Sequence, residues 1–160
     1  MSRTLVLLRH GKSDYLLGVP DHERPLNNRG RRQAALAGDW IRDDGLTVDA
    51  VLCSTAERTR QTLERTDIDA PTEYVSAIYG CTPDELFETI RVYAPHDAST
   101  LLVVGHFPGM PDTALTLDPA GSIDEFPTSA YAVVKVGVEW DRIGLDVDPD
   151  ASLTSLRIPR

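Results

Sequence analysis

The sequence predicts an α/β fold, a three-layer α/β/α sandwich with a mostly parallel central sheet. Short apolar runs recur along the chain, and such runs are typical of strands buried on both faces of a parallel sheet. Segments with helical spacing of apolar residues separate these runs, and strands that alternate with helices build layered α/β sandwiches. The 160 residues contain no internal repeat, so we expect a single domain that spans residues 1–160.

The first predicted element is a strand at residues 5–8, whose sequence is Leu-Val-Leu-Leu. A long loop rich in turn-forming residues follows, and a loop of this length inside a compact domain usually has a function. From residue 28 to about residue 44, small and apolar residues recur at helical spacing, with Asn27 or Asn28 as the N-cap.

The middle of the chain repeats the order of strand and helix. A second strand is predicted at residues 48–53. Residues 54–57, Ser-Thr-Ala-Glu, fit the capping box that opens a helix, which places Arg58 in the first helical turn. A further helix is predicted at residues 83–93, because a proline begins it, and residues 101–104 repeat the buried-strand pattern.

The last third of the chain contains weaker signals. Residues 108–117 predict a weak helix, since a glycine and a proline interrupt the pattern. Residues 131–138 and 153–158 predict two late strands, and the second is expected at a sheet edge because a proline follows it.

The net charge excludes some classes of partner. The chain has 16 Lys+Arg and 25 Asp+Glu, a net charge of −9, whereas nucleic-acid and anionic-membrane binding rest on accumulated Lys and Arg. We therefore expect neither partner. The charge is unevenly spread, because residues 1–65 carry +2 and residues 66–160 carry −11. All basic residues of the first part except Lys12 are arginines, whose planar guanidinium binds phosphate and carboxylate oxygens in pairs.

Cysteine usage and hydropathy predict a cytoplasmic protein. Cys53 and Cys81 are too few for a disulfide framework and form no CxxC motif, so both are expected to be reduced and structural. The early apolar run at residues 5–8 is much shorter than the roughly 7–15 residues of a signal-peptide core. No run approaches the roughly 20 apolar residues that span a bilayer.

Two histidines and two arginines follow predicted strands. Arg9 and His10 come directly after the first apolar run, and His106 follows the run at 101–104 in the same way. Arg58 lies in the first turn after the second strand. Because ligands of open α/β sheets bind at the carboxyl ends of the strands, we expect these four side chains to converge.

This set of residues suits phosphoryl chemistry. A neutral imidazole can attack phosphorus and hold the phosphoryl group covalently. The charge of the transferred group is spread over three oxygens, which Arg9 and Arg58 could bind. His106 could add a donor if it is protonated beside the dianion.

Three segments resemble the signatures of the histidine phosphatase superfamily, which includes the phosphoglycerate mutases. They are Leu-Leu-Arg-His-Gly at 7–11, Ser-Thr-Ala-Glu-Arg-Thr-Arg-Gln-Thr at 54–62 and Val-Gly-His-Phe-Pro-Gly at 104–109. Residues 9–14 and 21–30 are further similar to the short bacterial SixA-type phosphohistidine phosphatases. The resemblance covers most of the chain and thins after about residue 140.

The resemblance implies a phosphoglycerate mutase-like fold and a role for each strand-end residue. His10 would be the nucleophile, and Arg9, Arg58 and His106 would form the phosphate pocket. The mutase-like branch has a glutamate as general acid after the second signature, but residues 74–82 contain no acidic residue. The candidate proton donors are instead Asp21, His22 and Glu23 on the long loop, or none is needed, because protonated imidazole leaves readily from phosphohistidine.

Other interpretations of single motifs are weaker. A P-loop needs a glycine where Val6 stands, and the four histidines lack zinc-site spacing, so no metal or organic cofactor is indicated. His96 is expected to be exposed and without a function. Arg60 and Arg65 are expected to be solvated helix residues. The remaining arginines of the first part could rim a pocket for an acidic substrate or form local salt bridges: Arg24, Arg29, Arg31 and Arg32.

The function predicted from these features is a phosphatase that works through a covalent phosphohistidine intermediate. A chain of 160 residues leaves little room for lid insertions, and an open pocket favours phosphohistidine on a protein as the substrate. The alternatives are a phosphomonoesterase for small phosphoesters and a phosphate-recognition module without turnover. The presence of His10 argues against the second alternative.

Overall fold

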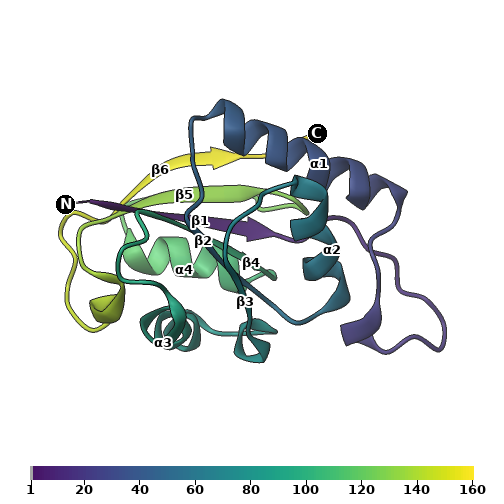
Figure 1. Ribbon diagram of the computed structural model, residues 1–160, viewed down its shortest axis with the longest axis horizontal. Helices are drawn as coiled ribbons and strands as arrows, with labels where there is room; N and C mark the ends of the chain where they lie inside the picture. The colour runs from purple at the N-terminus through teal and green to yellow at the C-terminus, as the bar shows by residue number, and fades with distance from the viewer. Residues whose placement is uncertain (1) are drawn as a thin grey trace.

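The computed structural model describes residues 2–160, which form one six-stranded sheet in the order β3-β2-β4-β1-β5-β6 (Figure 1). Strands β1 to β4 run parallel to one another, whereas β5 is antiparallel to β1 and β6 is antiparallel to β5. The sheet is therefore parallel in its middle, as predicted. The strands are β1 (Arg3–Arg9), β2 (Ala50–Cys53), β3 (Thr72–Tyr74), β4 (Thr100–Gly105), β5 (Tyr131–Val136) and β6 (Ser152–Arg157).

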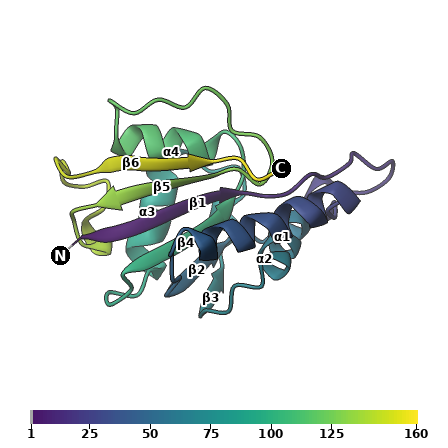
Figure 2. The same cartoon turned by 90° about the horizontal axis from the view of Figure 1, so that it is seen from above.

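Four α-helices complete the three layers, with α1 and α2 on one face of the sheet and α3 and α4 on the other (Figure 2). Alternate residues of β1 show why both faces are covered. Leu5 and Leu7 pack with α3 and α4, while Val6 and Leu8 pack with α1 and α2, and all four side chains are fully buried. The helices are α1 (Asn28–Asp43), α2 (Glu57–Thr66), α3 (Pro83–Tyr93) and α4 (Gly109–Leu117).

Helix boundaries follow the local capping chemistry. The side chain of Asn27 accepts a hydrogen bond from the Gly30 N–H and caps α1. Helix α3 has the predicted bounds, with Thr82 and Glu85 forming a capping box. Helix α4 is continuous where a weak helix was predicted, because its glycine and its proline fall in the first turn, where backbone N–H groups need no helical partner.

Two local predictions are wrong. Residues 54–57 do not form a capping box: α2 begins at Glu57, Ala56 is its N-cap, and no side chain caps it. The hydroxyl of Ser54 instead accepts from the Ala56 N–H at 3.3 Å and pairs with a histidine described below. The edge strand β3 was also missed, because its residues are exposed or half-buried and show no apolar alternation.

The late strands lie close to their predicted positions. Strand β5 ends two residues earlier than predicted, and β6 is an edge strand, as the following proline indicates. Among residues 2–160, no helix is long and apolar enough to cross a membrane.

Candidate active site

The carboxyl ends of three adjacent strands bring the predicted residues to one cavity of about 420 Å³, called here the strand-end cavity. His10 follows β1, Arg58 lies in the first turn of α2 after β2, and His106 follows β4. The ring centroids of His10 and His106 are 5.3 Å apart. The lining residues are Arg9, His10, Lys12, Ser13, Tyr15, Asp21, Arg24, Arg58, His106, Phe107 and Thr128.

His10 is held in one tautomer. Its Nδ1 is 2.6 Å from the carbonyl oxygen of Gly11, and because a carbonyl can only accept, Nδ1 carries the proton. Its Nε2 accepts a hydrogen bond from Nε of Arg58 at 3.3 Å, so this nitrogen is unprotonated and its electron pair is directed at Arg58. Burial first, and then the neighbouring cations Arg58 and Arg9, lower the pKa of His10 to about 3. The His10 ring is thus neutral, and its unprotonated nitrogen is Nε2.

The loop that carries His10 is fixed from two sides. The Gly11 N–H donates to the hydroxyl of Thr62 in α2 at 2.9 Å. A Cβ on Gly11 would lie 2.6 Å from the carbonyl oxygen of Gly30, and one on Gly30 would lie 2.0 Å from that of Lys12. The two backbones can approach this closely only because both residues are glycines.

Two guanidinium groups, that of the half-buried Arg9 and that of the buried Arg58, supply positive charge to the strand-end cavity. Arg9 donates from Nη1 to the carbonyl oxygen of Phe126 at 2.9 Å, and its buried Nε has no hydrogen-bond partner among the described atoms. Arg58 donates from Nη1 to the backbone oxygen of Asp21 at 2.7 Å and from Nη2 to its carboxylate at 3.1 Å. A backbone carbonyl orients Arg9, and Asp21 of the long loop orients Arg58. Each guanidinium retains N–H groups that can donate to a ligand.

His106 lies opposite His10 in the same cavity. Its Nε2 is 2.8 Å from the hydroxyl of Ser54. Burial lowers the pKa of His106 to about 4, and Arg58 adds to the effect. His106 is therefore neutral without a ligand, and a bound phosphoryl dianion would favour its protonated form.

Only one of the three candidate proton donors lines the strand-end cavity. Asp21 accepts from the hydroxyl of Tyr79, from Arg24 and from Arg58. These hydrogen bonds, that of Tyr79 above all, hold the pKa of Asp21 well below its usual range, so the carboxylate is ionised.

The other two candidates lie outside the lining of the cavity. His22 pairs through Nε2 with the Thr55 hydroxyl at 2.8 Å. Glu23 is exposed and is not among the lining residues.

Sequence reasoning missed two members of this network. Tyr79 follows the 3₁₀ turn at Ser76–Ile78, and its ring meets the edge of His106 at 5.3 Å. Nothing in the sequence around Tyr79 signals this position, since it depends on how the turn packs. Ser54 had a signal but was assigned to the wrong partner, a helix N-terminus in place of His106.

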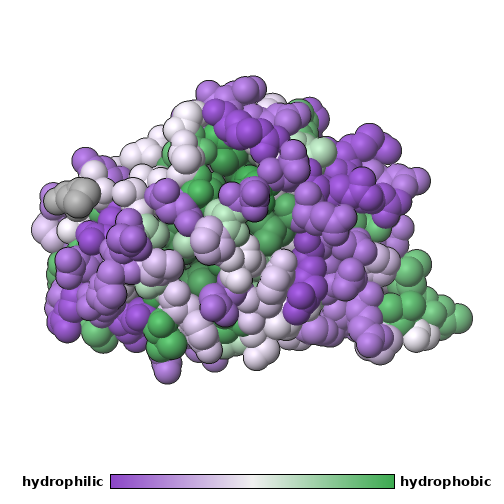
Figure 3. All heavy atoms as spheres, viewed as in Figure 1, coloured by the Kyte–Doolittle hydropathy of each residue, from purple (hydrophilic) through white to green (hydrophobic). Residues whose placement is uncertain are grey.

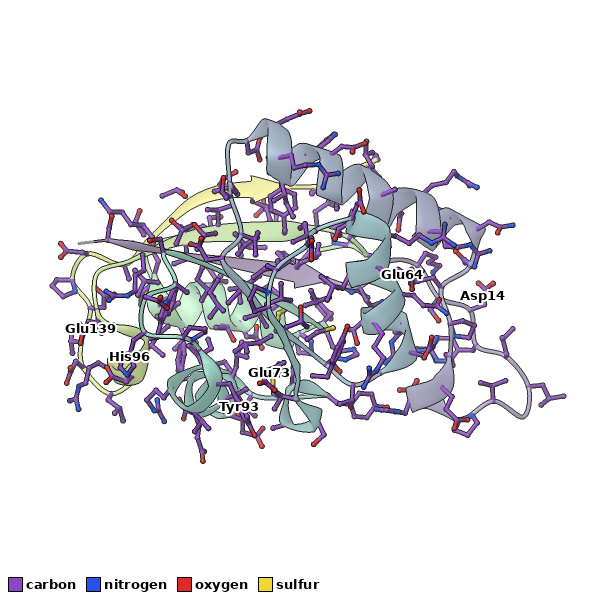
Figure 4. All side chains as sticks on the ribbon, viewed as in Figure 1. Asp14, Glu64, Glu73, Tyr93, His96 and Glu139 are labelled. Atoms are coloured by element: carbon purple, nitrogen blue, oxygen red, sulfur yellow. The ribbon has the colours of Figure 1, made fainter. Side chains whose placement is uncertain are left out.

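Other residues with reactive or charged side chains lie apart from the strand-end cavity. His96 is exposed at the end of the molecule opposite Asp14 (Figure 4). Arg60 lies over the ring of Tyr74 at 4.2 Å, outside the cavity. Burial raises the pKa of the Cys53 thiol to about 12 and that of Cys81 to about 11, which makes both poor nucleophiles.

Metal-ligating side chains do not gather in the part of the chain that the structure describes. Within residues 2–160, no three His, Cys, Asp or Glu side chains are placed to hold a metal ion.

Comparisons with known proteins agree with this arrangement. The histidine phosphatase superfamily (branch 1) matches residues 5–76. The uncharacterized protein Rv1276c of Mycobacterium tuberculosis is 44% identical over 96% of this chain and 100% of its own. A protein from Nakamurella multipartitia, assigned as phosphohistidine phosphatase SixA, is 36% identical with a TM-score of 0.88, over 99% of this chain and 97% of its own.

A more distant solved structure shows the same fold. It is the protein histidine phosphatase SixA complexed with tungstate, 22% identical with a TM-score of 0.79, over 98% of this chain and 97% of that one. The relatives from Mycobacterium tuberculosis and Nakamurella multipartitia match over nearly their whole length and are each more than one-third identical to this chain. The family match begins within β1 and covers α1, β2 and α2. On these grounds the chain belongs to the histidine phosphatase superfamily and is one of its SixA-like members.

Proposed function

We propose that this protein is a phosphatase that removes phosphoryl groups through a covalent intermediate on His10, and that its substrate is phosphohistidine on a protein. The observation that carries the proposal is the tautomer of His10. Its Nδ1 proton is committed to the Gly11 carbonyl, so Nε2 presents an electron pair at neutral pH beside two guanidinium groups.

In the first step, Nε2 of His10 attacks the phosphorus atom of the substrate. A phosphorus–nitrogen bond forms to His10 as the bond to the leaving group breaks, and the leaving group takes the electron pair. Arg9 and Arg58 bind the three equatorial oxygens. His106 takes a proton from solvent water as the dianion approaches, because the negative charge raises its pKa, and donates that proton in a hydrogen bond to one of the oxygens. The Gly11 carbonyl stabilises the positive charge that develops on the His10 ring.

In the second step, water attacks the phosphorus of the phosphoenzyme and His10 leaves with the electron pair. The products are inorganic phosphate and the original neutral imidazole. A histidine leaving group, protonated before cleavage, departs without an acid from the protein. This fits the state of Asp21, which is ionised and bound to three donors, and it supports phosphohistidine over an alkyl phosphate as the substrate.

The shape of the cavity supports a protein substrate. Two of the large apolar side chains that line it, Tyr15 and Phe107, are exposed, and Leu17, two residues after Tyr15, is fully accessible. A small phosphoester would leave this rim in water, whereas a protein surface would cover it. Two proteins of similar fold, from Nakamurella multipartitia and Agrobacterium tumefaciens, are assigned as phosphohistidine phosphatases SixA. We propose the cytoplasm as the site of action, because the two cysteines are too few for a disulfide framework.

Trapping the intermediate tests the nucleophile. The protein is incubated with a labelled phosphodonor and quenched in alkali, which preserves phosphohistidine and hydrolyses acyl phosphates. We expect an acid-labile phosphoenzyme in the wild type and none in His10→Ala. Equal labelling of both proteins would overturn the assignment of His10.

Comparing substrates tests the class. Turnover of a phosphohistidine protein is measured against a panel of small phosphate monoesters, with tungstate as an oxyanion competitor for both. We expect kcat/KM to be higher for the protein. A preference for one monoester would identify a small-molecule phosphatase, and binding without turnover would identify a recognition module.

A further inference from the structure

A second cavity next to the strand-end cavity is strongly basic. It has a volume of about 380 Å³ and is called here the arginine cavity. Its lining residues are Arg29, Arg32, Gln33, Leu36 and Arg160. They include no Asp or Glu, although the chain has 25 of them, and four other cavities each include at least one.

The arginines of this part of the chain fall into two groups. Arg24 is buried, where it binds the Asp21 carboxylate at 2.9 Å, and Arg31 donates to the backbone oxygen of Leu26. Arg29 and Arg32 are exposed, and within residues 2–160 neither has a carboxylate at ion-pair distance. A local salt bridge therefore accounts for the position of Arg24, whereas Arg29 and Arg32 have no such partner among residues 2–160. Hydrophilic side chains gather over α1, which carries both (Figure 3).

One side chain separates the two cavities. Gln33 lines the arginine cavity, and its Oε1 accepts from the Lys12 N–H at 3.3 Å and from the Thr128 hydroxyl at 2.9 Å. Lys12 and Thr128 both line the strand-end cavity. A large molecule whose phosphoryl group occupies the strand-end cavity can thus reach the arginine cavity, because the two cavities share the contacts of Gln33.

We propose that the arginine cavity docks carboxylate side chains of the phosphoprotein substrate, beside its phosphohistidine. This rests on the proposed function and deepens it. Guanidinium groups without partners bind carboxylates in pairs of hydrogen bonds, and two of them fix the orientation of an acidic surface. The overall charge of −9 repels acidic proteins, so a local basic surface selects those that present acid at this position.

The test compares Arg29→Gln/Arg32→Gln with a control that removes the same charge elsewhere, Arg65→Gln/Lys135→Gln. Both control residues are exposed and lie outside the two cavities. Glutamine keeps helix propensity close to that of arginine, so α1 is retained. Binding of a fluorescein-labelled hexaglutamate peptide is followed by anisotropy at low and high salt.

We expect the Arg29/Arg32 variant to bind the peptide roughly three- to thirtyfold more weakly than the control at low salt, and the difference to vanish at high salt. The KM for an acidic phosphohistidine protein should rise by a similar factor, with turnover of a small phosphohistidine unchanged. Equal peptide binding by the two variants, no binding by the wild type, or an unchanged KM would overturn the proposal. If the wild type hydrolyses no phosphohistidine protein, the proposed function fails by that measurement, while peptide binding still decides whether the cavity takes carboxylates.

Discussion

At the scale of the residue, burial decides which proton state His10 has. The ring is 8% exposed, and the cost of burying a charge holds its pKa at about 3, while that of His106 is about 4. The proposed nucleophile must keep its electron pair, and the low pKa keeps the His10 ring neutral across the physiological range.

The first prediction concerns these two rings. In ¹⁵N spectra of the histidine-labelled protein, the shifts of His10 and His106 should stay constant from pH 8 down to pH 5, because both rings remain neutral. In urea, where the protein is unfolded, both rings should titrate with a pKa of about 6.5. Phosphoenzyme formation at pH 5 should match that at pH 7. A native midpoint near pH 6.5 would show that burial does not control His10.

The second prediction concerns Asp21. Its carboxylate is ionised and orients Arg58, so it is not expected to donate a proton to the leaving group. In Asp21→Asn, the ratio of kcat for p-nitrophenyl phosphate to kcat for phenyl phosphate should stay within about twofold of the wild-type ratio. A ratio that rises on the order of a hundredfold would instead identify Asp21 as the general acid, because only the poorer leaving group needs one.

At the scale of the element, the strand ends make the cavity and the loops complete it. Parallel pairing of β2, β4 and β1 places the residues that follow them at one edge of the sheet. Helix α1 then holds the loop after β1 through the contact between Gly30 and Lys12.

The third prediction follows from that contact. Replacing glycine by alanine inside a helix normally stabilises it by about 1 kcal/mol. Gly30→Ala should instead destabilise the protein by about 2 kcal/mol or more and lower kcat, because the new Cβ displaces the Lys12 backbone and with it the His10 loop. Ala35→Gly in the exposed face of α1 is the control, expected to cost about 1 kcal/mol without loss of kcat. Urea denaturation and steady-state kinetics measure both, and a stabilised Gly30→Ala would contradict the argument.

The elements that the sequence could predict are those with a local signal. Apolar runs located β1, β2 and β4, and the rule that ligands bind at strand ends then placed His10, Arg58 and His106 together. The positions of the Tyr79 and Arg24 side chains could not be predicted, because Tyr79 contacts Asp21 and Arg24 contacts Ser13 only once the chain has folded. The capping-box error has the same origin, since a tertiary hydrogen bond to His106 took the Ser54 hydroxyl.

At the scale of the whole molecule, the net charge and the cavities have opposite signs. The chain carries −9, yet both the strand-end cavity and the arginine cavity present more guanidinium than carboxylate groups. An acidic exterior disfavours extended polyanions, and two adjacent basic cavities admit a phosphoryl group and a neighbouring carboxylate. Selectivity thus comes from where the few exposed cations lie, which the overall count of charges does not show.

The fourth prediction is that the two buried histidines lower the stability of the whole molecule in acid. Their pKa values in the folded protein, about 3 and about 4, lie below the value of about 6.5 expected in the unfolded chain. Between these values the unfolded chain binds two protons that the folded protein does not. The free energy of unfolding therefore falls as the pH drops from about 6.5, by up to about 1.4 kcal/mol per pH unit for each ring.

Titration of the carboxylates acts over the same range, so the effect of one ring is measured as a difference between two proteins. Urea denaturation of the wild type and of His106→Gln is followed from pH 7 to pH 4.5. The variant has one proton-binding difference fewer, so its free energy of unfolding should fall less steeply, by up to about 1.4 kcal/mol per pH unit, whatever its stability at pH 7. Parallel curves would mean that His106 has the same pKa in the folded and the unfolded protein, in contradiction to the effect of burial. The imidazolium would then form below about pH 6.5 without substrate, and the dianion would not be needed to create it in that range.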